Sequence, residues 1–293
     1  MTLLVRIALM IEGQEDVTWE DWVALADACE RSGIEALFRS DHYLSVMGEG
    51  ERGALDAWAV INALAARTTK LRLGTMVSPT SFRHPSVLAR LVIAADHVSG
   101  GRIELGMGTG WSEVEHTASG FPFLSMKERM DVLEEQLEIV HDGYFGDGSS
   151  FSFKGEHYEL NDLKARPRPV QDPHPPLIMG GNAGPRAARL AARYADEYNT
   201  VMPTLDQIRE RKANIDAACA KAGRDPIPFT IMTAASVGKD HPDADPDTWI
   251  AGSVDQVKAR LRELEAAGVS GAYLQLQDHR DIAMVELIGK ELT

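Results

Sequence analysis

The chain has 293 residues and a mass of 32.1 kDa, enough for two ordinary domains or for one α/β barrel. Hydrophobic residues make up 44% of the sequence and charged residues 25%, which excludes a disordered chain and predicts a large core. The formal net charge of −14 repels phosphate backbones and anionic lipid. Nucleic acid and membranes are therefore excluded as expected partners, and a small-molecule substrate is favoured.

The cysteines and the amino-terminal segment predict a cytoplasmic protein. Cys29 and Cys219 are far apart and each lies in a helical pattern, so we expect two packing residues in a reducing compartment. The first apolar run has no basic segment before it and no small-residue cleavage site after it, so we expect no signal peptide. No apolar run approaches the length needed to span a membrane.

Apolar runs of strand length alternate with segments of helical period along the whole chain. This alternation is typical of parallel strands joined by helical crossovers. The predicted strands are eight runs rich in Val, Ile, Leu and Ala, at 4–11, 35–40, 71–77, 102–108, 176–181, 197–202, 229–237 and 271–275.

Capping residues predict where the intervening helices begin and end. Thr18 precedes a helical pattern that Gly33 is placed to terminate. Pro85 and Pro185 stand where a first helical turn tolerates a missing amide hydrogen. Three Ser/Thr-x-x-Glu/Gln capping boxes add further helix starts, at Ser125 and Glu128, Thr204 and Gln207, and Ser253 and Gln256.

The stretch 143–175 departs from the even spacing of strands and helices. We interpret it as an insertion in a single domain that spans 1–293. The alternating segment FSFKGEHYEL within it favours a short hairpin. Such an insertion either covers an active site or only pads one face of the molecule, and both interpretations stay open.

Eight strands with helices between them can close as a barrel or stay open as a doubly wound sheet. An open dinucleotide-binding sheet carries its glycine fingerprint after an early strand. Here the nearest match, GMGTGW at 106–111, follows the fourth strand and lacks the last glycine. We therefore predict an α/β fold, a (β/α)₈ TIM barrel with an insertion between strands 4 and 5.

The residues after the second predicted strand are the best candidates for catalysis. Arg39, Ser40, Asp41 and His42 stand at that strand's carboxyl end, which is the active-site face of a barrel. An imidazole can give or take a proton near neutral pH, and a neighbouring carboxylate can orient a cofactor donor. Asp and His are also ordinary turn residues, so a structural role remains the alternative.

Turns and glycines after the third, fourth and fifth predicted strands are candidates for cofactor contacts. The segment 75–79 is typical of a strained peptide or bulge at the same barrel face, or else of a strand end followed by a loop. Gly106, Gly108 and Gly110 allow a flat ring to approach the backbone, or else serve tight strand-to-helix packing. The glycine-rich turn 180–184 precedes a helix and can bind phosphate, although such turns are common without any ligand.

Patterns for metal and nucleophile chemistry are weak. Glu113 and His116 lie one helical turn apart, but the second Glu-x-x-His of a di-metal site is missing. The sequence has no HExxH motif and no paired CxxC, so we predict no metal. It also has no GxSxG motif, which leaves hydrolase chemistry unsupported.

Several blocks in fixed order carry a family resemblance that covers nearly the whole chain. They are FRSDHY, LGTMVSPTSFRHP, GGRIELGMGTGWSEVEH, ARPRPVQ before PPLIMGGNAG, and LAARYADEYN. With them the sequence resembles the bacterial luciferase-like monooxygenase superfamily, and most resembles its probable coenzyme F420-dependent oxidoreductase branch. The resemblance implies a (β/α)₈ barrel with an insertion, usually a homodimer, with the cofactor across the carboxyl ends of the strands.

The resemblance also implies roles for individual residues. Asp41 would meet the deazaflavin ring, and His42 would be the catalytic proton donor or acceptor. Met76 and Val77 would form a bulge behind the ring through a non-prolyl cis peptide, with Ser78 beside it. The remaining cofactor contacts implied are Thr109, Gly110 and Trp111, with Gly180, Gly181 and Ala183 at the phosphate end.

One position departs from the family pattern. The sugar-phosphate dehydrogenases of the family have a glutamate where Trp111 stands here, which puts that substrate class in doubt; Glu113 is near enough to substitute. We predict an oxidoreductase that transfers a hydride between coenzyme F420 and an unidentified organic substrate. The alternatives are a monooxygenase that uses reduced FMN and oxygen, and a non-catalytic barrel that binds a ligand or serves as a partner subunit.

Overall fold

The computed structural model describes residues 5–46 and 51–293. The strands are β1 (Arg6–Ile11), β2 (Ala36–Arg39), β3 (Arg72–Thr75), β4 (Ser78–Pro79), β5 (Ile103–Gly108), β6 (Phe151–Lys154), β7 (Glu159–Leu163), β8 (Leu177–Gly180), β9 (Glu197–Val201), β10 (Phe229–Val237), β11 (Ile250–Gly252) and β12 (Gly271–Leu276). The helices are α1 (Trp19–Ser32), α2 (Ala57–Arg67), α3 (Pro85–Ser99), α4 (Glu113–Ser119), α5 (Met126–Glu138), the π-helix η1 (Ile139–Tyr144), α6 (Pro185–Tyr194), α7 (Leu205–Ala222), α8 (Val254–Ala266) and α9 (Ile282–Leu292).

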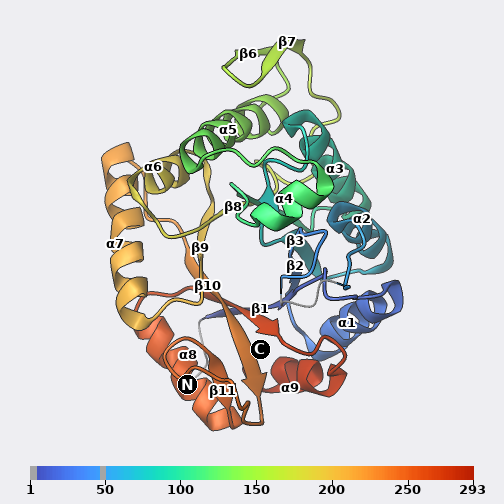
Figure 1. Cartoon of the computed structure of the whole chain (residues 1–293), viewed down its shortest axis with the longest axis vertical. Helices are drawn as coiled ribbons and strands as arrows, with labels where there is room; N and C mark the ends of the chain where they lie inside the picture. The colour runs from blue at the N-terminus through green and yellow to red at the C-terminus, as the bar shows by residue number, and fades with distance from the viewer. Residues whose placement is uncertain (1–4, 47–50) are drawn as a thin grey trace.

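The strands form a closed parallel barrel surrounded by helices (Figure 1). Strand pairing runs β1, β2, β3, β5, β8, β9, β10 and β12, and β12 returns to β1. Every one of these pairs is parallel, so all the carboxyl ends lie at one face. The predicted (β/α)₈ TIM barrel is therefore confirmed.

All eight predicted strands occur, with small differences at their ends. Leu4, which begins the first predicted strand, lies outside the described residues. The third predicted strand is shorter than expected, because β3 ends at Thr75 and the chain pairs again only at β4, beyond the predicted end at Val77. The prediction missed β11, which pairs with β10 over three residues.

Capping chemistry sets the helix ends as predicted. Thr18 caps α1 and Gly33 ends it in the left-handed conformation at φ 85°. Pro85 and Pro185 occupy the first turns of α3 and α6. The three predicted capping boxes begin α5, α7 and α8.

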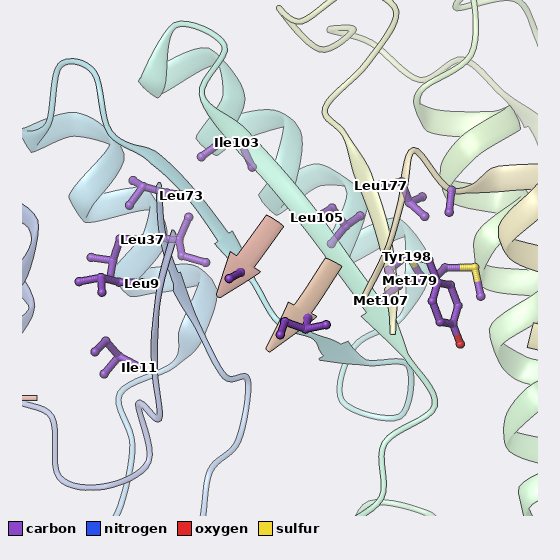
Figure 2. Packing of buried hydrophobic residues seen from close by; sticks show 14 of the residues in the cluster. Leu9, Ile11, Leu37, Leu73, Ile103, Leu105, Met107, Leu177, Met179 and Tyr198 are labelled. Carbon is purple, nitrogen blue, oxygen red and sulfur yellow. The ribbon is translucent and has the colours of Figure 1, made fainter. Parts of the chain in front are cut away.

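Alternation along the strands divides the core into two layers. Leu9, Leu37 and Leu73 belong to the layer between barrel and helices, and Figure 2 shows them close together. Met10 and Phe38, one position further along their strands, belong to a smaller cluster. That cluster fills the barrel interior with Ala8, Met10, Ala36, Phe38, Met76, Ile178, Met232 and Tyr273.

Buried charges lie near the amino ends of the strands. Glu104 is 2% exposed and accepts hydrogen bonds from Arg6, at 2.6 and 3.0 Å, and from Arg72. Tyr273 donates to Glu197 at 2.7 Å, and burial raises the pKa of this carboxyl despite its hydrogen bonds. We call these five residues the amino-end network.

The predicted hairpin is present within the insertion. Strands β6 and β7 pair antiparallel and project beyond α5 (Figure 1). Cys29 and Cys219 are free and fully buried, in agreement with the packing roles predicted for them. Among the described residues, no helix combines the length and the apolar character needed to cross a bilayer.

Candidate active site

Asp41 lies immediately after β2 and is held by two donors. Ser78 Oγ and Arg83 Nη1 each donate to Asp41 Oδ2 at 2.6 Å. The Asp41 side chain is 1% exposed, and its other oxygen, Oδ1, is buried and has no hydrogen-bond partner among the described residues. Arg83 also donates to Asp56 at 2.5 Å, so one guanidinium joins two carboxylates. Arg83 was not among the predicted site residues.

His42 forms a largely buried pair with Glu115, a carboxylate that was not among the predicted site residues. Its Nδ1 lies 2.7 Å from Glu115 Oε2, and because a carboxylate only accepts, Nδ1 is the donor. No hydrogen bond within 5–46 and 51–293 involves Nε2. The indole of Trp111 meets the imidazole edge-on, with ring centroids 5.5 Å apart.

The environment of His42 favours its protonated form. Burial by itself lowers the pKa of His42, but the hydrogen bond and negative charge of Glu115 outweigh burial, so the pKa is raised above 6.5. The carboxylates of Glu12 and Asp41 act in the same direction. His42 is thus held in a state able to donate or accept a proton near neutral pH.

Val77 explains two of the predicted glycines. The Met76–Val77 peptide is cis, as the resemblance implies. A Cβ on Gly106 would collide with the backbone of Thr75, and a Cβ on Gly108 would lie 2.6 Å from Val77 Cγ2. Both glycines are buried, and they pack against the Thr75–Val77 segment rather than against a helix, which differs from the strand-to-helix packing considered for them.

The turn after β5 is tied to helix α5. Gly110 adopts φ 74°, and Arg129 donates to its carbonyl oxygen. Arg129 donates in addition to Leu124 O at 3.1 Å, and its guanidinium lies over the Phe123 ring. None of these partners is a carboxylate. Within the described residues, Arg129 therefore has no acidic side chain to neutralise its charge.

A pocket of about 360 Å³ opens beside this turn. Its lining includes two arginines, Arg83 and Arg129, and two histidines, His84 and His157, and no carboxylate among the described residues. Of these, Arg83 is already paired with acids. Residues Thr80, Ser81, Thr109, Pro122, Leu124, Val132 and Tyr158 complete the lining.

Tyr158 and His84 can each offer a hydrogen-bond donor to the pocket, and the inserted hairpin covers one side of it. Tyr158 OH accepts from Gln136 at 2.7 Å, which leaves the hydroxyl hydrogen available. His84 Nδ1 accepts from the amide of Ser86 at 3.2 Å, so neutral His84 carries its hydrogen on Nε2. His157 and Tyr158 come from the β6–β7 hairpin, so the insertion covers one side of this pocket.

The glycine-rich turn after β8 is less open than its sequence suggests. Ala183 is fully buried, and its amide donates to Tyr198 OH at 2.8 Å. The amide of Gly181 donates to Asn199 O at 3.1 Å. A Cβ on Gly180 would stand 3.5 Å from Val77 Cγ1, which places this glycine beside the Val77 side chain.

The structure separates the two acidic residues of α4. Glu113 is exposed and Glu115 is buried, so Glu113 is not the carboxylate that reaches the site. His116 is buried with both ring nitrogens in hydrogen bonds, to Ser112 O and Ser81 Oγ at 2.6 Å each. Across the described residues, no three His, Cys, Asp or Glu side chains are grouped to hold a metal ion.

Comparison with known proteins gives relatives with two different cofactors. Residues 1–245 match the family model for luciferase-like monooxygenase. The FMNH(2)-dependent dimethylsulfone monooxygenase of Pseudomonas putida is 33% identical over 199 residues, which are 68% of this chain and 52% of that protein. The F420-dependent glucose-6-phosphate dehydrogenase of Amycolatopsis mediterranei (strain U-32) is 34% identical over 181 residues, 61% of this chain and 52% of that protein. The matches thus span about half the length of these relatives.

Solved structures resemble the whole chain in fold. An F420-dependent secondary alcohol dehydrogenase in complex with an F420-acetone adduct superposes with a TM-score of 0.85 over 100% of this chain and 98% of that chain. Its sequence is 18% identical, so this likeness concerns the fold. Because the family model covers 245 of the 293 residues, the chain belongs to the luciferase-like monooxygenase family.

Proposed function

We propose that this protein is an oxidoreductase that transfers a hydride between coenzyme F420 and an organic substrate, with His42 exchanging the accompanying proton. The observation that carries the proposal is the His42–Glu115 pair at 2.7 Å, at the carboxyl-end face of the barrel. The other ring nitrogen of His42, Nε2, remains available for proton exchange, as general acid–base chemistry requires.

The residues at this face fit a flat, anionic cofactor. Asp41 Oδ1 is a buried acceptor that lacks a donor, which a ring N–H or O–H would supply. Arg83, which donates to Asp41 and also lines the basic pocket, joins the two regions, and in that pocket Arg129 would bind the anionic end of the cofactor. Gly180 and Gly181 would let the cofactor approach the backbone, whereas the occupied Ala183 amide leaves this residue a packing role in the turn.

Coenzyme F420, when bound, supplies the hydride-accepting and hydride-donating carbon. The chain supplies position and proton exchange. When the substrate is oxidised, neutral His42 accepts at Nε2 the proton that the substrate releases; when the substrate is reduced, the imidazolium returns it. Trp111, whose side chain is 64% exposed beside His42, would shield the substrate from water.

Replacing His42 tests this proposal. His42→Ala should reduce turnover by about 100-fold or more while F420 binding changes little, because the imidazole acts on the proton and not on the cofactor. Turnover is followed by F420 fluorescence with a panel of alcohols, and with reduced F420 and activated alkenes. His141→Ala, on η1 and outside the site, is the matched control. Unchanged turnover in His42→Ala would refute the assignment.

A monooxygenase that uses reduced FMN and oxygen is the second candidate. The FMNH(2)-dependent monooxygenase of Pseudomonas putida is about as similar to this chain as the F420-dependent dehydrogenase of Amycolatopsis mediterranei. The proposed ring and anion contacts suit either cofactor. Titration of the purified protein with F420 and with FMN, oxidised and reduced, separates them; tighter binding of FMN would replace our proposal with this one.

We also propose that the protein is a cytoplasmic homodimer. Val87 and Val98 are each 52% exposed on α3, and the neighbouring helix α2 also exposes alanines. Exposed apolar side chains on adjacent helices would suit an association surface. Light scattering should give twice the chain mass of 32.1 kDa, and a monomer mass would contradict the proposal. Cell fractionation checks the compartment, which two buried free thiols favour.

A further inference from the structure

Glu115 is a buried acid with three partners in one short segment. Its Oε2 accepts from His42 Nδ1 at 2.7 Å, while Oε1 accepts from the backbone amides of Tyr43 and, at 3.2 Å, Leu44. The Glu115 side chain is 1% exposed. A buried carboxylate is stable only when its oxygens are bonded in this way.

This arrangement joins two elements far apart in the sequence. Glu115 belongs to α4, after β5, whereas His42 to Leu44 follow β2. The two amides fix the turn and the carboxylate fixes the imidazole, so one side chain sets both the backbone and the ring. Holding structure alone would need only the amide contacts; the bond to Nδ1 also determines which ring nitrogen is left for chemistry.

We propose that Glu115 is a positioning residue for His42. It holds the hydrogen of the neutral imidazole on Nδ1, so that Nε2 is the atom that exchanges the proton with the substrate. This inference rests on the proposed function of His42 and deepens it. A buried acid that holds an imidazole by its Nδ1–H acts in the same manner in other enzymes.

The substitution Glu115→Gln separates positioning from folding. The glutamine oxygen can still accept from Tyr43 and Leu44, but its NH₂ group would face His42 Nδ1 as a donor. Neutral His42 would then carry its hydrogen on Nε2, and the atom that should accept a proton would no longer have a free lone pair. Turnover should fall by about 100-fold. Glu113→Gln, the same change on the exposed side of α4, should leave turnover unchanged.

The first measurement needs no cofactor. Nitrogen-15 NMR of the histidines in the free protein, with His42 assigned through His42→Ala, reports both tautomer and titration. We expect an Nδ1–H tautomer in the wild type and an Nε2–H tautomer in Glu115→Gln, with the midpoint of His42 moved to lower pH. Glu12 and Asp41, the other acids that act on His42, remain and limit this movement. An unchanged tautomer and midpoint would overturn the inference.

The second measurement is the pH profile of kcat/KM. In Glu115→Gln the limb that belongs to His42 should move to lower pH together with the NMR midpoint. A changed tautomer with wild-type turnover would also overturn the inference. If Glu115→Gln does not fold, Glu115→Asp, which keeps the charge but is one methylene shorter, should lie between wild type and a loss of about 100-fold; wild-type turnover and tautomer there would overturn it.

The failure of this inference is distinguishable from failure of the proposed function. If His42→Ala retains full turnover, the proposed function is wrong regardless of Glu115. If His42→Ala loses turnover and Glu115→Gln does not, His42 acts without Glu115.

Discussion

The two ends of the barrel both bury charged groups, but they bury them in different ways. At the amino end, Arg6 and Arg72 converge on Glu104, whose oxygens are all bonded within the network. At the carboxyl end, Asp41 has one oxygen without a donor and His42 one nitrogen without a partner in the described chain.

The difference distinguishes groups that hold the fold from groups ready for a ligand. A buried charge by itself is weak evidence of function, because ion-pair networks also shift pKa values. Burial raises the pKa of Glu104, yet its hydrogen bonds and charges from Arg6 and Arg72 outweigh this and lower it. What marks the carboxyl end is incomplete pairing beside a pocket where Arg129 has no acid partner among the described residues.

The largest effect should come from breaking the amino-end network. Glu104→Gln removes the charge that Arg6 and Arg72 share, and should lower the free energy of unfolding by about 3 kcal/mol. Urea unfolding measures it. The Kd of F420 should stay at the wild-type value, because Glu104 lies at the opposite end of the barrel from the pocket. A change in Kd without a change in stability would contradict this division of roles.

Replacing Arg129 at the carboxyl end should have a smaller effect, and this effect should appear mainly in cofactor affinity and only slightly in stability. Arg129→Met removes the unneutralised guanidinium from the pocket and should weaken F420 binding by about 30-fold, or about 2 kcal/mol. The free energy of unfolding should fall by only about 1 kcal/mol, through the lost bonds to two carbonyl oxygens. Fluorescence titration measures the affinity, and Arg129→Lys, which keeps the charge, should recover part of it. Equal affinity in Arg129→Met and wild type would remove Arg129 from the site.

The fold could be predicted because its signals are local and repeated. Each barrel strand is an apolar run, and each capping box shows in four consecutive residues. The strand β11 escaped prediction because three residues carry no period, and β3 ends early because the chain turns at Met76 and Val77 before β4 pairs with β5. Such an end depends on tertiary contact between Val77 and the glycines of β5.

The site could be predicted only where its residues follow a strand. Asp41 and His42 do so, but Glu115 and Arg129 reach the site from helices. Nearness to Trp111 favoured Glu113 as the acid of the site. Ser112 caps a helix, however, and each helical residue is rotated by about 100° from the one before it, so Glu115 lies about 200° around the helix from Glu113. The cap at Ser112 was the signal that could have separated the two acids.

The smallest expected effect is in the pH dependence of stability. The amino-end and carboxyl-end groups should contribute to stability over different pH ranges. The folded pKa of Glu104 is lowered from 4.5, so its contribution is complete above pH 4.5 and is lost as the pH falls through the folded value. The folded pKa of His42 is raised above 6.5, so its contribution is complete below pH 6.5 and is lost as the pH rises through the folded value. Burial raises the pKa of Glu115, but its hydrogen bonds and the charge of His42 outweigh burial and lower it. The ion pair with His42 also requires Glu115 to be ionised.

Urea unfolding of wild type, Glu104→Gln and Glu115→Gln over a range of pH measures the two contributions. The gap between wild type and Glu104→Gln should narrow only in acid. The gap for Glu115→Gln, about 1 kcal/mol or less, should be widest between pH 4.5 and 6.5 and should narrow on both sides. A gap for Glu115→Gln that does not vary above pH 6.5 would mean that His42 titrates independently of Glu115. The backbone contacts of Glu115 would then account for all of its contribution to stability.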